Sequence, residues 1–243
     1  MSETAPPDPI AIVLPTYNEA ENIEALIGEI LALDHEQRFA ILVVDDGSPD
    51  GTGRLVTELS QRDARVELIS RPSKLGLGTA YLAGYRRALE LEAELIFTLD
   101  ADFSHRPAHI PELLALVGEA DLVIGSRYIP GGALRDWPLH RRLLSAGANW
   151  LARLALGLPN RDCTSGFRCY RRELLRDVPL AEITSDGYSF LIDMLWHCRR
   201  AGARIVESPI TFCERRGGTS KISKAEIFKA FSTLWRLWRR GGK

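Results

Sequence analysis

The stretch Leu95-Ile-Phe-Thr-Leu-Asp-Ala-Asp102 is a short apolar run that ends in two carboxylates two positions apart. An apolar run of this length predicts a strand that is buried on both faces. In an extended chain, residues two apart face the same side, so Asp100 and Asp102 converge on one point. Paired carboxylates at a strand end suit Mg²⁺ or Mn²⁺, whose remaining ligands would be phosphate oxygens. Such a pair also occurs by chance, and its position after an apolar strand is what favours a functional interpretation.

Apolar runs followed by polar residues recur along the first half of the chain. Besides the run before Asp100, they occupy residues 10–14, 40–44, 66–69 and 122–124. Segments with helical spacing of apolar residues lie between them, at 23–31, 55–59 and 81–91. This alternation predicts a Rossmann-like α/β fold, in which a mainly parallel sheet is covered by helices on both faces.

Polar residues stand where each of these predicted strands ends. They are residues 16–19, Asp45 with Asp46, residues 100–102, and Ser126 with Arg127. In open sheets of this kind, ligands bind outside the carboxyl ends of the strands. We therefore expect these residues to meet at one edge of the sheet and to form an active site. The carboxylates of Asp45 and Asp46 also suit hydrogen bonds from a nucleobase or a ribose.

Two competing motifs fail at a required position. The residues from Asp46 to Gly51 resemble the opening of an EF-hand loop, but Thr57 stands where that loop requires a bidentate Glu. Gly76-Leu-Gly78 lacks the third glycine of a dinucleotide-binding fingerprint, because Tyr81 occupies that position. The sequence therefore excludes a calcium hand and disfavours a dinucleotide site.

The second half of the chain is less regular. The segment 128–137 is rich in Gly and Pro and predicts a mobile loop. Helical spacing follows at 141–156 and 188–200, and residues 205–213 alternate like a strand that Pro209 places at a sheet edge or bulge. We expect a disordered lead-in over residues 1–9, one domain over residues 10–221 and a basic amphipathic helix over residues 222–243.

Charge is unevenly distributed over the chain, although the formal net charge is only −1. Residues 215–243 contain nine Lys or Arg and one acidic residue, a charge of +8, whereas residues 1–214 carry −9. The near-neutral total speaks against a nucleic-acid partner. The basic C-terminal segment indicates an anionic partner such as lipid head groups.

The C-terminal segment also has an apolar face. It combines Ile227, Phe228, Phe231, Leu234, Trp235, Leu237 and Trp238 with Lys229, Arg236, Arg239 and Arg240. Two interpretations stand side by side. The segment is either a helix packed on the domain's own core or an interfacial helix on an anionic membrane surface.

Cysteine usage and hydropathy point to the cytoplasm. The four cysteines, at positions 163, 169, 198 and 213, form no zinc-binding pattern and are expected to be reduced thiols. The N-terminus has no apolar signal region, and no run of about 18 apolar residues predicts a transmembrane helix. We expect a cytoplasmic protein that lies peripherally on the cytoplasmic face of a membrane.

The ordered set of motifs resembles a known enzyme family. Four motifs are typical of inverting family 2 glycosyltransferases: Leu14-Pro-Thr-Tyr-Asn-Glu19, Val43-Val-Asp-Asp-Gly-Ser48, Leu75-Gly-Leu-Gly78 and Asp100-Ala-Asp102. Four more narrow the resemblance to dolichol- or polyprenol-phosphate mannose synthases: Asp100-Ala-Asp-Phe-Ser-His-Arg-Pro107, Gly125-Ser-Arg-Tyr128, Thr164-Ser-Gly-Phe-Arg168 and Gly218-Thr-Ser-Lys221. Singly these motifs are modest, but as an ordered set from about Ile10 to Lys221 they are highly specific.

The resemblance implies a GT-A fold, a divalent metal (Mg²⁺ or Mn²⁺) at Asp100 and Asp102, and two groups of binding residues. The nucleotide-sugar pocket would use Pro15, Tyr17, Glu19, Val43, Asp45, Asp46, Lys74, Gly78, Asp100, Ala101 and Asp102. The acceptor phosphate would meet Arg127, Arg142, Ser145, Arg215 and Lys221, of which Arg127, Arg215 and Lys221 would act in catalysis with the two metal-binding carboxylates.

The chain departs from the family pattern in two respects. Some relatives carry a metal-binding Gln two residues after the second Asp, where this chain has Ser104, so a water may take that place. Many relatives also carry C-terminal transmembrane helices, which this sequence does not predict. Membrane attachment would then come from the amphipathic tail, the bound lipid or an integral membrane partner.

The implied reaction is transfer of mannose from GDP-mannose to a polyprenyl monophosphate with inversion, giving polyprenyl phosphate β-mannose and GDP. Three alternatives remain open on the residues themselves. The same fold could use UDP-glucose to make polyprenyl-phosphate glucose. A nucleotidyltransferase also uses acidic metal sites on α/β sheets, although it lacks this order of motifs. The last alternative is a non-enzymatic membrane-associated binding module.

Overall fold

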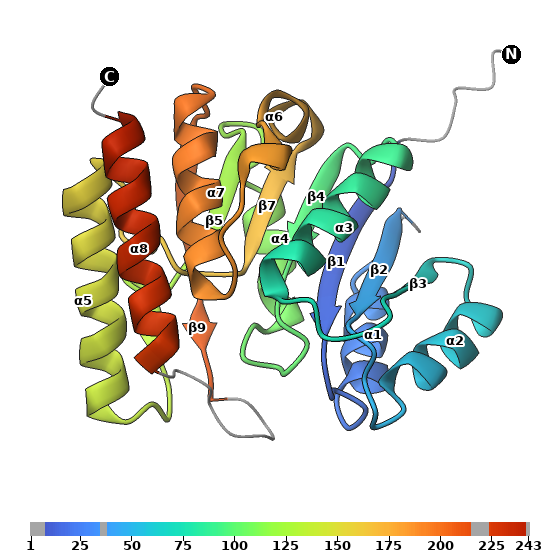
Figure 1. The fold of residues 1–243 in the computed structure, drawn as a ribbon. Coiled ribbons are helices and arrows are strands. Elements are labelled where there is room, and N and C mark those ends of the chain that lie inside the picture. Colours follow the sequence, from blue (N-terminus) through green and yellow to red (C-terminus); the bar gives the residue numbers. More distant parts are fainter. Residues whose placement is uncertain (1–7, 35–37, 215–223, 242–243) are drawn as a thin grey trace, which may run out of the picture.

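A seven-stranded sheet forms the centre of the molecule, in the order β3-β2-β1-β4-β7-β5-β8 (Figure 1). The computed structural model describes residues 8–34, 38–214 and 224–241. Its strands are β1 (Ile10–Thr16), β2 (Phe39–Asp45), β3 (Val66–Ser70), β4 (Leu95–Thr98), β5 (Leu122–Ser126), β7 (Arg168–Arg171) and β8 (Ile205–Pro209). Strand β7 runs antiparallel to β4 and β5, and the other neighbouring pairs are parallel. The predicted mainly parallel sheet is confirmed.

Helices cover both faces of this sheet because its strands alternate apolar side chains between the two faces. On one face, Ile12 and Leu14 join a core formed with α1 (Ile23–Ala32), α2 (Thr52–Arg62) and α4 (Ile110–Leu114). On the other face, Ala11 and Val13 join a core formed with α3 (Leu77–Glu90), α6 (Arg172–Asp177) and α7 (Tyr188–Arg200). Short 3-10 turns at Pro107–His109 and Leu180–Glu182 precede α4 and α7.

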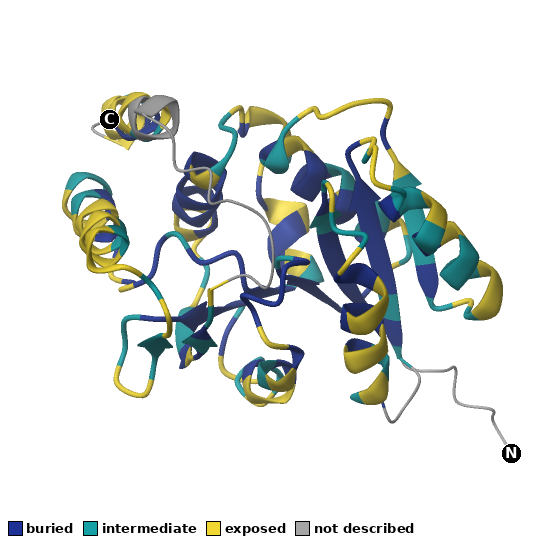
Figure 2. Ribbon diagram, turned by 90° about the horizontal axis from the view of Figure 1, so that it is seen from below, coloured by how far each residue is buried: buried dark blue, intermediate teal, exposed yellow. Residues whose placement is uncertain are grey.

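Two long helices lie outside these layers. Helix α8 (Lys224–Gly241) packs on α7, and α5 (Leu139–Leu156) packs on α8 (Figure 1). Most residues of α5, and most of residues 229–241 in α8, are exposed or partly exposed (Figure 2). In α5 only Asn149 and Ala152 are buried. None of the helices in the described residues is long and apolar enough to cross a membrane.

The second half differs from the sequence-based prediction in two places. The segment 128–137, predicted as a mobile loop, contains β6 (Ala133–Leu134), which pairs with β9 (Thr211–Phe212). The ring of Trp137 packs edge-on against Phe212 at 5.3 Å, so the segment is fastened at its end. Strand β7 was not predicted, because its four residues begin and end with Arg.

Two further elements predicted for the second half are present in the structure. The strand at 205–213 is divided into β8 and β9, and β8 forms one edge of the sheet with Pro209 as its last residue, as expected. The predicted helix at 188–200 is α7. Residues 1–7 of the predicted lead-in, and the predicted site residues Arg215 and Lys221, lie outside the described residues. The division into lead-in, domain and tail stays a prediction.

Candidate active site

A cavity of about 840 Å³ opens at the carboxyl ends of β1, β4 and β5. Helices α5, α7 and α8 form its opposite wall. Eight of the residues predicted from the sequence line this cavity together: Pro15, Tyr17, Glu19, Asp100, Ala101, Asp102, Arg127 and Ser145. The expectation that polar residues at several strand ends meet at one edge is therefore met for β1, β4 and β5.

The remaining predicted nucleotide residues do not line the cavity. Val43 is part of the apolar core, and Gly78 lies in the first turn of α3. Lys74 places its ammonium 4.0 Å from the ring centroid of Tyr17, which itself lines the cavity. Lys74 is thus adjacent to the cavity through a cation–π contact, which attracts a cation to the ring face.

The carboxylates of Asp45 and Asp46 hold turns in place. Asp45 is buried and accepts hydrogen bonds from the Thr16 hydroxyl and the Ser48 amide, both at 3.0 Å. Asp46 accepts the amides of Leu75 and Gly76 at 3.2 and 3.1 Å. Asp46 also forms a 2.8 Å ion pair with Arg71, yet burial outweighs that charge and raises its pKa. Both side chains therefore shape the loops beside the cavity.

The basic residues of α5 are arranged differently from the prediction. Arg142 donates hydrogen bonds to the carbonyls of Trp137 and Leu134 at 2.9 and 3.1 Å and does not line the cavity. Its neighbour Arg141 does line it, next to the ring of Trp137 and 2.7 Å from Glu214. Successive helical residues are rotated by about 100° around the axis, which explains why one arginine faces the cavity and the next does not.

The acidic pair lies directly after β4, and both of its members line the cavity. The side chain of Asp100 is 35% exposed, whereas Asp102 is buried and accepts the Ser104 amide at 3.0 Å. The Tyr81 hydroxyl reaches Asp100 at 3.4 Å. The loop thus presents two carboxylates to the same space, as the spacing predicted.

His105 holds the backbone of this loop. Its Nδ1 accepts the Asp100 amide at 3.1 Å, so the ring proton belongs on Nε2. Burial lowers the pKa of His105 to about 3, which keeps the imidazole neutral near neutral pH. The 3.4 Å approach of Nδ1 to the Asp100 carboxylate is therefore no ion pair.

The residues at this position suit a divalent cation that shares its coordination with a ligand. No group of three or more His, Cys, Asp or Glu that could hold a metal exists among the described residues. Two carboxylates and phosphate oxygens are nevertheless a common ligand set for Mg²⁺. The hydroxyl of Ser104 lies beside Asp102 in the cavity wall, is buried and makes no hydrogen bond within the described residues.

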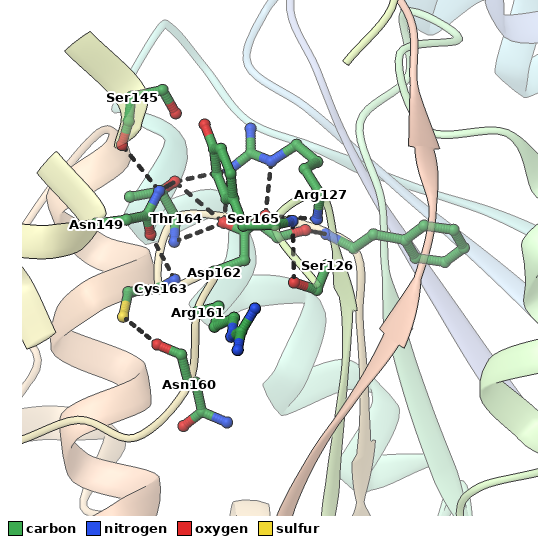
Figure 3. Close-up of polar contacts among 12 residues, drawn as sticks. Ser126, Arg127, Ser145, Asn149, Asn160, Arg161, Asp162, Cys163, Thr164 and Ser165 are labelled. Atoms are coloured by element: carbon green, nitrogen blue, oxygen red, sulfur yellow. Dashed lines mark hydrogen bonds and ion pairs between the residues drawn. The ribbon is translucent and has the colours of Figure 1, made fainter. Parts of the chain in front are cut away.

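Arg127, at the end of β5, is locked by a buried carboxylate (Figure 3). Its Nε and Nη2 donate to Asp162 at 2.7 and 2.6 Å, and its amide donates to the same side chain at 3.0 Å. Burial alone would raise the pKa of Asp162, but the charge and hydrogen bonds of Arg127 hold it below its ordinary value. The same pairing raises the pKa of Arg127 against the effect of burial. This bidentate pair fixes the guanidinium at the cavity wall.

A further set of hydrogen bonds ties Arg127 to α5 (Figure 3). Arg127 Nη2 donates to the Thr164 hydroxyl at 2.7 Å, which also accepts Asn149 Nδ2 at 3.1 Å. Asn149 accepts the Cys163 amide at 2.6 Å and donates to the Ser145 carbonyl at 2.9 Å. Sequence reasoning did not assign roles to Asp162 or Asn149. A polar residue on the buried side of an otherwise apolar helix face is the signal that marks Asn149.

Much of the cavity wall that the helices form is apolar. Its apolar side chains are Leu143, Leu144 and Leu151 of α5, Leu191 and Ile192 of α7, and Phe231 and Leu234 of α8, and the same helices also contribute Arg141, Ser145 and Tyr188. One space thus combines a polar end, with Asp100, Asp102 and Arg127, and an apolar end. Such a space fits a ligand with a charged head and a hydrocarbon body.

A mainly parallel sheet with an acidic pair at the end of a central strand is the arrangement expected of a GT-A glycosyltransferase. The model of the family described as Glycosyl transferase family 2 matches residues 11–178. The chain belongs to this family and is a glycosyltransferase, which confirms the resemblance seen in the motifs.

Two relatives are similar over nearly the whole chain. Polyprenol monophosphomannose synthase of Mycolicibacterium smegmatis is 46% identical over 223 residues, covering 90% of this chain and 83% of the relative. Undecaprenyl-phosphate mannosyltransferase of Micrococcus luteus is 42% identical over 233 residues, covering 95% of each.

Solved structures confirm the fold. Glucosyl-3-phosphoglycerate synthase from Mycobacterium tuberculosis, in complex with Mn²⁺, UDP and glucosyl-3-phosphoglycerate, matches with a TM-score of 0.66 at 23% identity, over 97% of this chain and 80% of that chain. Mannosyl-3-phosphoglycerate synthase from Rubrobacter xylanophilus matches with a TM-score of 0.70 at 21% identity, over 96% and 75%. At these identities the likeness concerns the fold.

Proposed function

We propose that this glycosyltransferase transfers mannose from GDP-mannose to a polyprenyl monophosphate of the dolichyl type, with inversion, releasing GDP. The two relatives that cover most of the chain are named for mannosyl transfer to polyprenyl phosphates. The observation that carries the acceptor class is the composite cavity, in which the acidic pair and Arg127 adjoin an apolar wall from α5, α7 and α8. A small polar acceptor would leave that apolar wall uncovered, whereas a prenyl chain would bury its hydrocarbon against it.

The donor would lie at the ends of β1 and β4. Pro15, Tyr17 and Glu19 face the base and ribose in this proposal, and Asp100 to Asp102 face the diphosphate. Asp45, Asp46, Lys74 and Gly78 would support this pocket from the surrounding loops.

The chemistry requires no strong base. A lipid monophosphate has a second pKa near 6, so at neutral pH it is already largely an oxyanion. One of its oxygens attacks the anomeric carbon, the bond from that carbon to the diphosphate breaks, and GDP leaves with the electron pair. Direct displacement inverts an α-linked donor to a β-linked product. Arg127, with Arg141 and Ser145 at the same wall, would hold the acceptor phosphate in line and offset the repulsion between two anions.

Asp100 and Asp102 are the residues that would hold Mg²⁺ or Mn²⁺. The ion, when bound, supplies charge neutralisation for the departing diphosphate. Arg215 and Lys221 remain proposed catalytic residues for the phosphates, and Arg142 a proposed acceptor residue on resemblance.

Membrane attachment would come from the outer faces of α5 and α8. Exposed apolar side chains that do not line the cavity lie on both helices: Leu139, Trp150 and Leu154 on α5, and Trp235 and Trp238 on α8. Helix α5 contains no Asp or Glu, and four basic residues of α8 lie among residues 229–241. Aromatic residues interleaved with cations suit the head-group region of an anionic bilayer. We therefore propose that the enzyme binds peripherally to the cytoplasmic face of a membrane. An integral membrane protein is a further proposed partner.

Comparing the affinities of the protein for GDP and UDP tests which nucleotide the sugar donor carries. We expect GDP to bind the protein in the presence of Mn²⁺ more tightly than UDP by at least about tenfold, a difference of ~1.4 kcal/mol. Isothermal titration of both nucleotides measures this. Preference for UDP would contradict GDP-mannose and favour the UDP-glucose alternative. Absence of binding by either would contradict a nucleotide-sugar enzyme altogether.

A further inference from the structure

The segment 184–187, immediately before α7, contacts two parts of the molecule that serve different substrates in the proposed function. On one side lies the glycine loop, residues 75–78, whose amides at Leu75 and Gly76 donate to the donor-side carboxylate Asp46. On the other side lies α8, which lines the apolar end of the cavity.

The glycine loop presses against this segment so closely that side chains are excluded. The Gly78 amide donates to Asp186 Oδ1 at 3.2 Å. A Cβ at Gly76 would lie 2.5 Å from the Asp186 carboxylate, and one at Gly78 would lie 2.6 Å from the Ser185 carbonyl. Because Asp46 accepts the Gly76 amide from the other side, the loop is held between two carboxylates.

Helix α8 is fastened to the same segment. Lys229 approaches Asp186 Oδ2 at 3.6 Å, and the Thr233 hydroxyl lies 3.2 Å from Ser185 Oγ. Arg236 donates hydrogen bonds to the hydroxyls of Thr184 and Ser185.

A buried carboxylate anchors these contacts. Asp193 of α7 is 1% exposed, pairs with Arg236 at 2.8 Å and accepts the Ser185 hydroxyl at 2.6 Å. The half-exposed pair of Lys229 and Asp186 contributes little by itself. The pair of the partly exposed Arg236 with the buried Asp193 is the strong part of the connection, because loss of Arg236 leaves a buried carboxylate without its main compensation.

We propose that the segment 184–187 couples the glycine loop to α8, with Asp186 as the positioning residue that touches both. One oxygen of its carboxylate receives the loop and the other faces Lys229. A nucleotide-sugar bound beside the glycine loop would thereby stabilise α8, which lines the apolar part of the cavity. Conversely, destabilising α8 would destabilise the glycine loop. The assignment of the two substrates to the two ends rests on the proposed function; the mechanical link between loop and helix does not.

Hydrogen exchange on the full chain tests the link without nucleotide. We expect Arg236→Gln to speed exchange of the amides at 76–80 by about threefold or more, because it removes the anchor on the far side of the segment. Arg239→Gln is the matched control, since Arg239 is exposed on the same helix and loses the same charge. Unchanged exchange at 76–80 in Arg236→Gln would overturn the proposal. Equal acceleration in β1 and β2 would also overturn it, because it would indicate general destabilisation.

A second arm uses nucleotide and the variant Asp186→Asn. At saturating GDP or UDP with Mn²⁺, amides at 229–240 of the unaltered protein should exchange at least about threefold more slowly, and Asp186→Asn should remove this effect. Retention of the effect in Asp186→Asn would overturn the coupling. If neither GDP nor UDP binds the unaltered protein, the proposed function fails. The hydrogen-exchange experiment without nucleotide still tests whether the glycine loop is coupled to α8. If Arg236→Gln does not fold, Arg236→Lys replaces it in the nucleotide-free experiment, because it keeps the charge near Asp193 but loses hydrogen bonds to the segment.

Discussion

The carboxylate of Asp162 is 0% exposed and compensates a guanidinium that is itself buried. Removing one partner of such a pair leaves an uncompensated charge away from water. We predict that Asp162→Asn lowers the free energy of unfolding by about 3–5 kcal/mol at neutral pH. Urea unfolding measures the change. Asp121→Asn, which breaks a partly exposed pair with Arg204, is the control and should cost less than about 1 kcal/mol.

The same pair has a defined pH dependence. The pKa of Asp162 is lower in the folded protein than its ordinary value, so its contribution is complete above the unfolded value near 3.9 and is lost as pH falls through the folded value. The stability difference between Asp162→Asn and the unaltered protein should therefore shrink in acid. A difference that is constant from pH 7 down to about pH 3 would contradict the assigned ionisation.

Single residues also show where sequence reasoning stops. The acidic pair at Asp100 and Asp102 could be predicted because strand periodicity and the carboxyl end of a strand fix its place. The partner of Arg127 could not, because Asp162 is 35 positions away and is brought in by the fold. The family resemblance assigned Arg142 to the acceptor phosphate, whereas in the structure its neighbour Arg141 lines the cavity, a difference that depends on the rotation of α5 and is not visible in the sequence.

At the scale of elements, the apolar runs located the parallel strands, and spacing located α7. Strand β7 escaped because it is short and carries arginines, of which Arg168 is buried through hydrogen bonds to the carbonyls of Cys163 and Ser165. A charged side chain that is satisfied by backbone carbonyls has no hydrophobic signature. Tertiary contacts therefore decided this element.

Helices α5 and α8 carry the prediction about membrane binding. Replacing Trp235 and Trp238 by Ser removes two exposed apolar side chains that do not line the cavity. Since a fully buried side chain of this size contributes about 1.5–3 kcal/mol, we predict at least about tenfold weaker binding to phosphatidylglycerol vesicles, with partial insertion allowed for. Co-sedimentation measures it, and Leu75→Ser, an exposed apolar side chain in the glycine loop, is the control. If the double variant binds vesicles as tightly as the unaltered protein, α8 only packs on the domain and takes no part in membrane binding.

At the scale of the whole molecule, two walls of different polarity enclose the cavity. The sheet, through the ends of β1, β4 and β5, provides the polar wall that sequence patterns anticipate. The apolar wall comes from α5, α7 and α8, whose mutual packing links residues up to about a hundred positions apart in the chain. Short-range periodicity cannot specify such packing, and so the composite cavity emerged only in the structure.

Transfer of labelled mannose from GDP-mannose to a polyprenyl phosphate in detergent tests the central claim most directly. We predict label in the lipid with Mg²⁺ or Mn²⁺, loss of transfer with EDTA, and at least about a hundredfold lower turnover in Asp102→Asn, because several kcal/mol of leaving-group stabilisation disappear. No label in the lipid from a folded protein that binds GDP, or full turnover in Asp102→Asn, would contradict it.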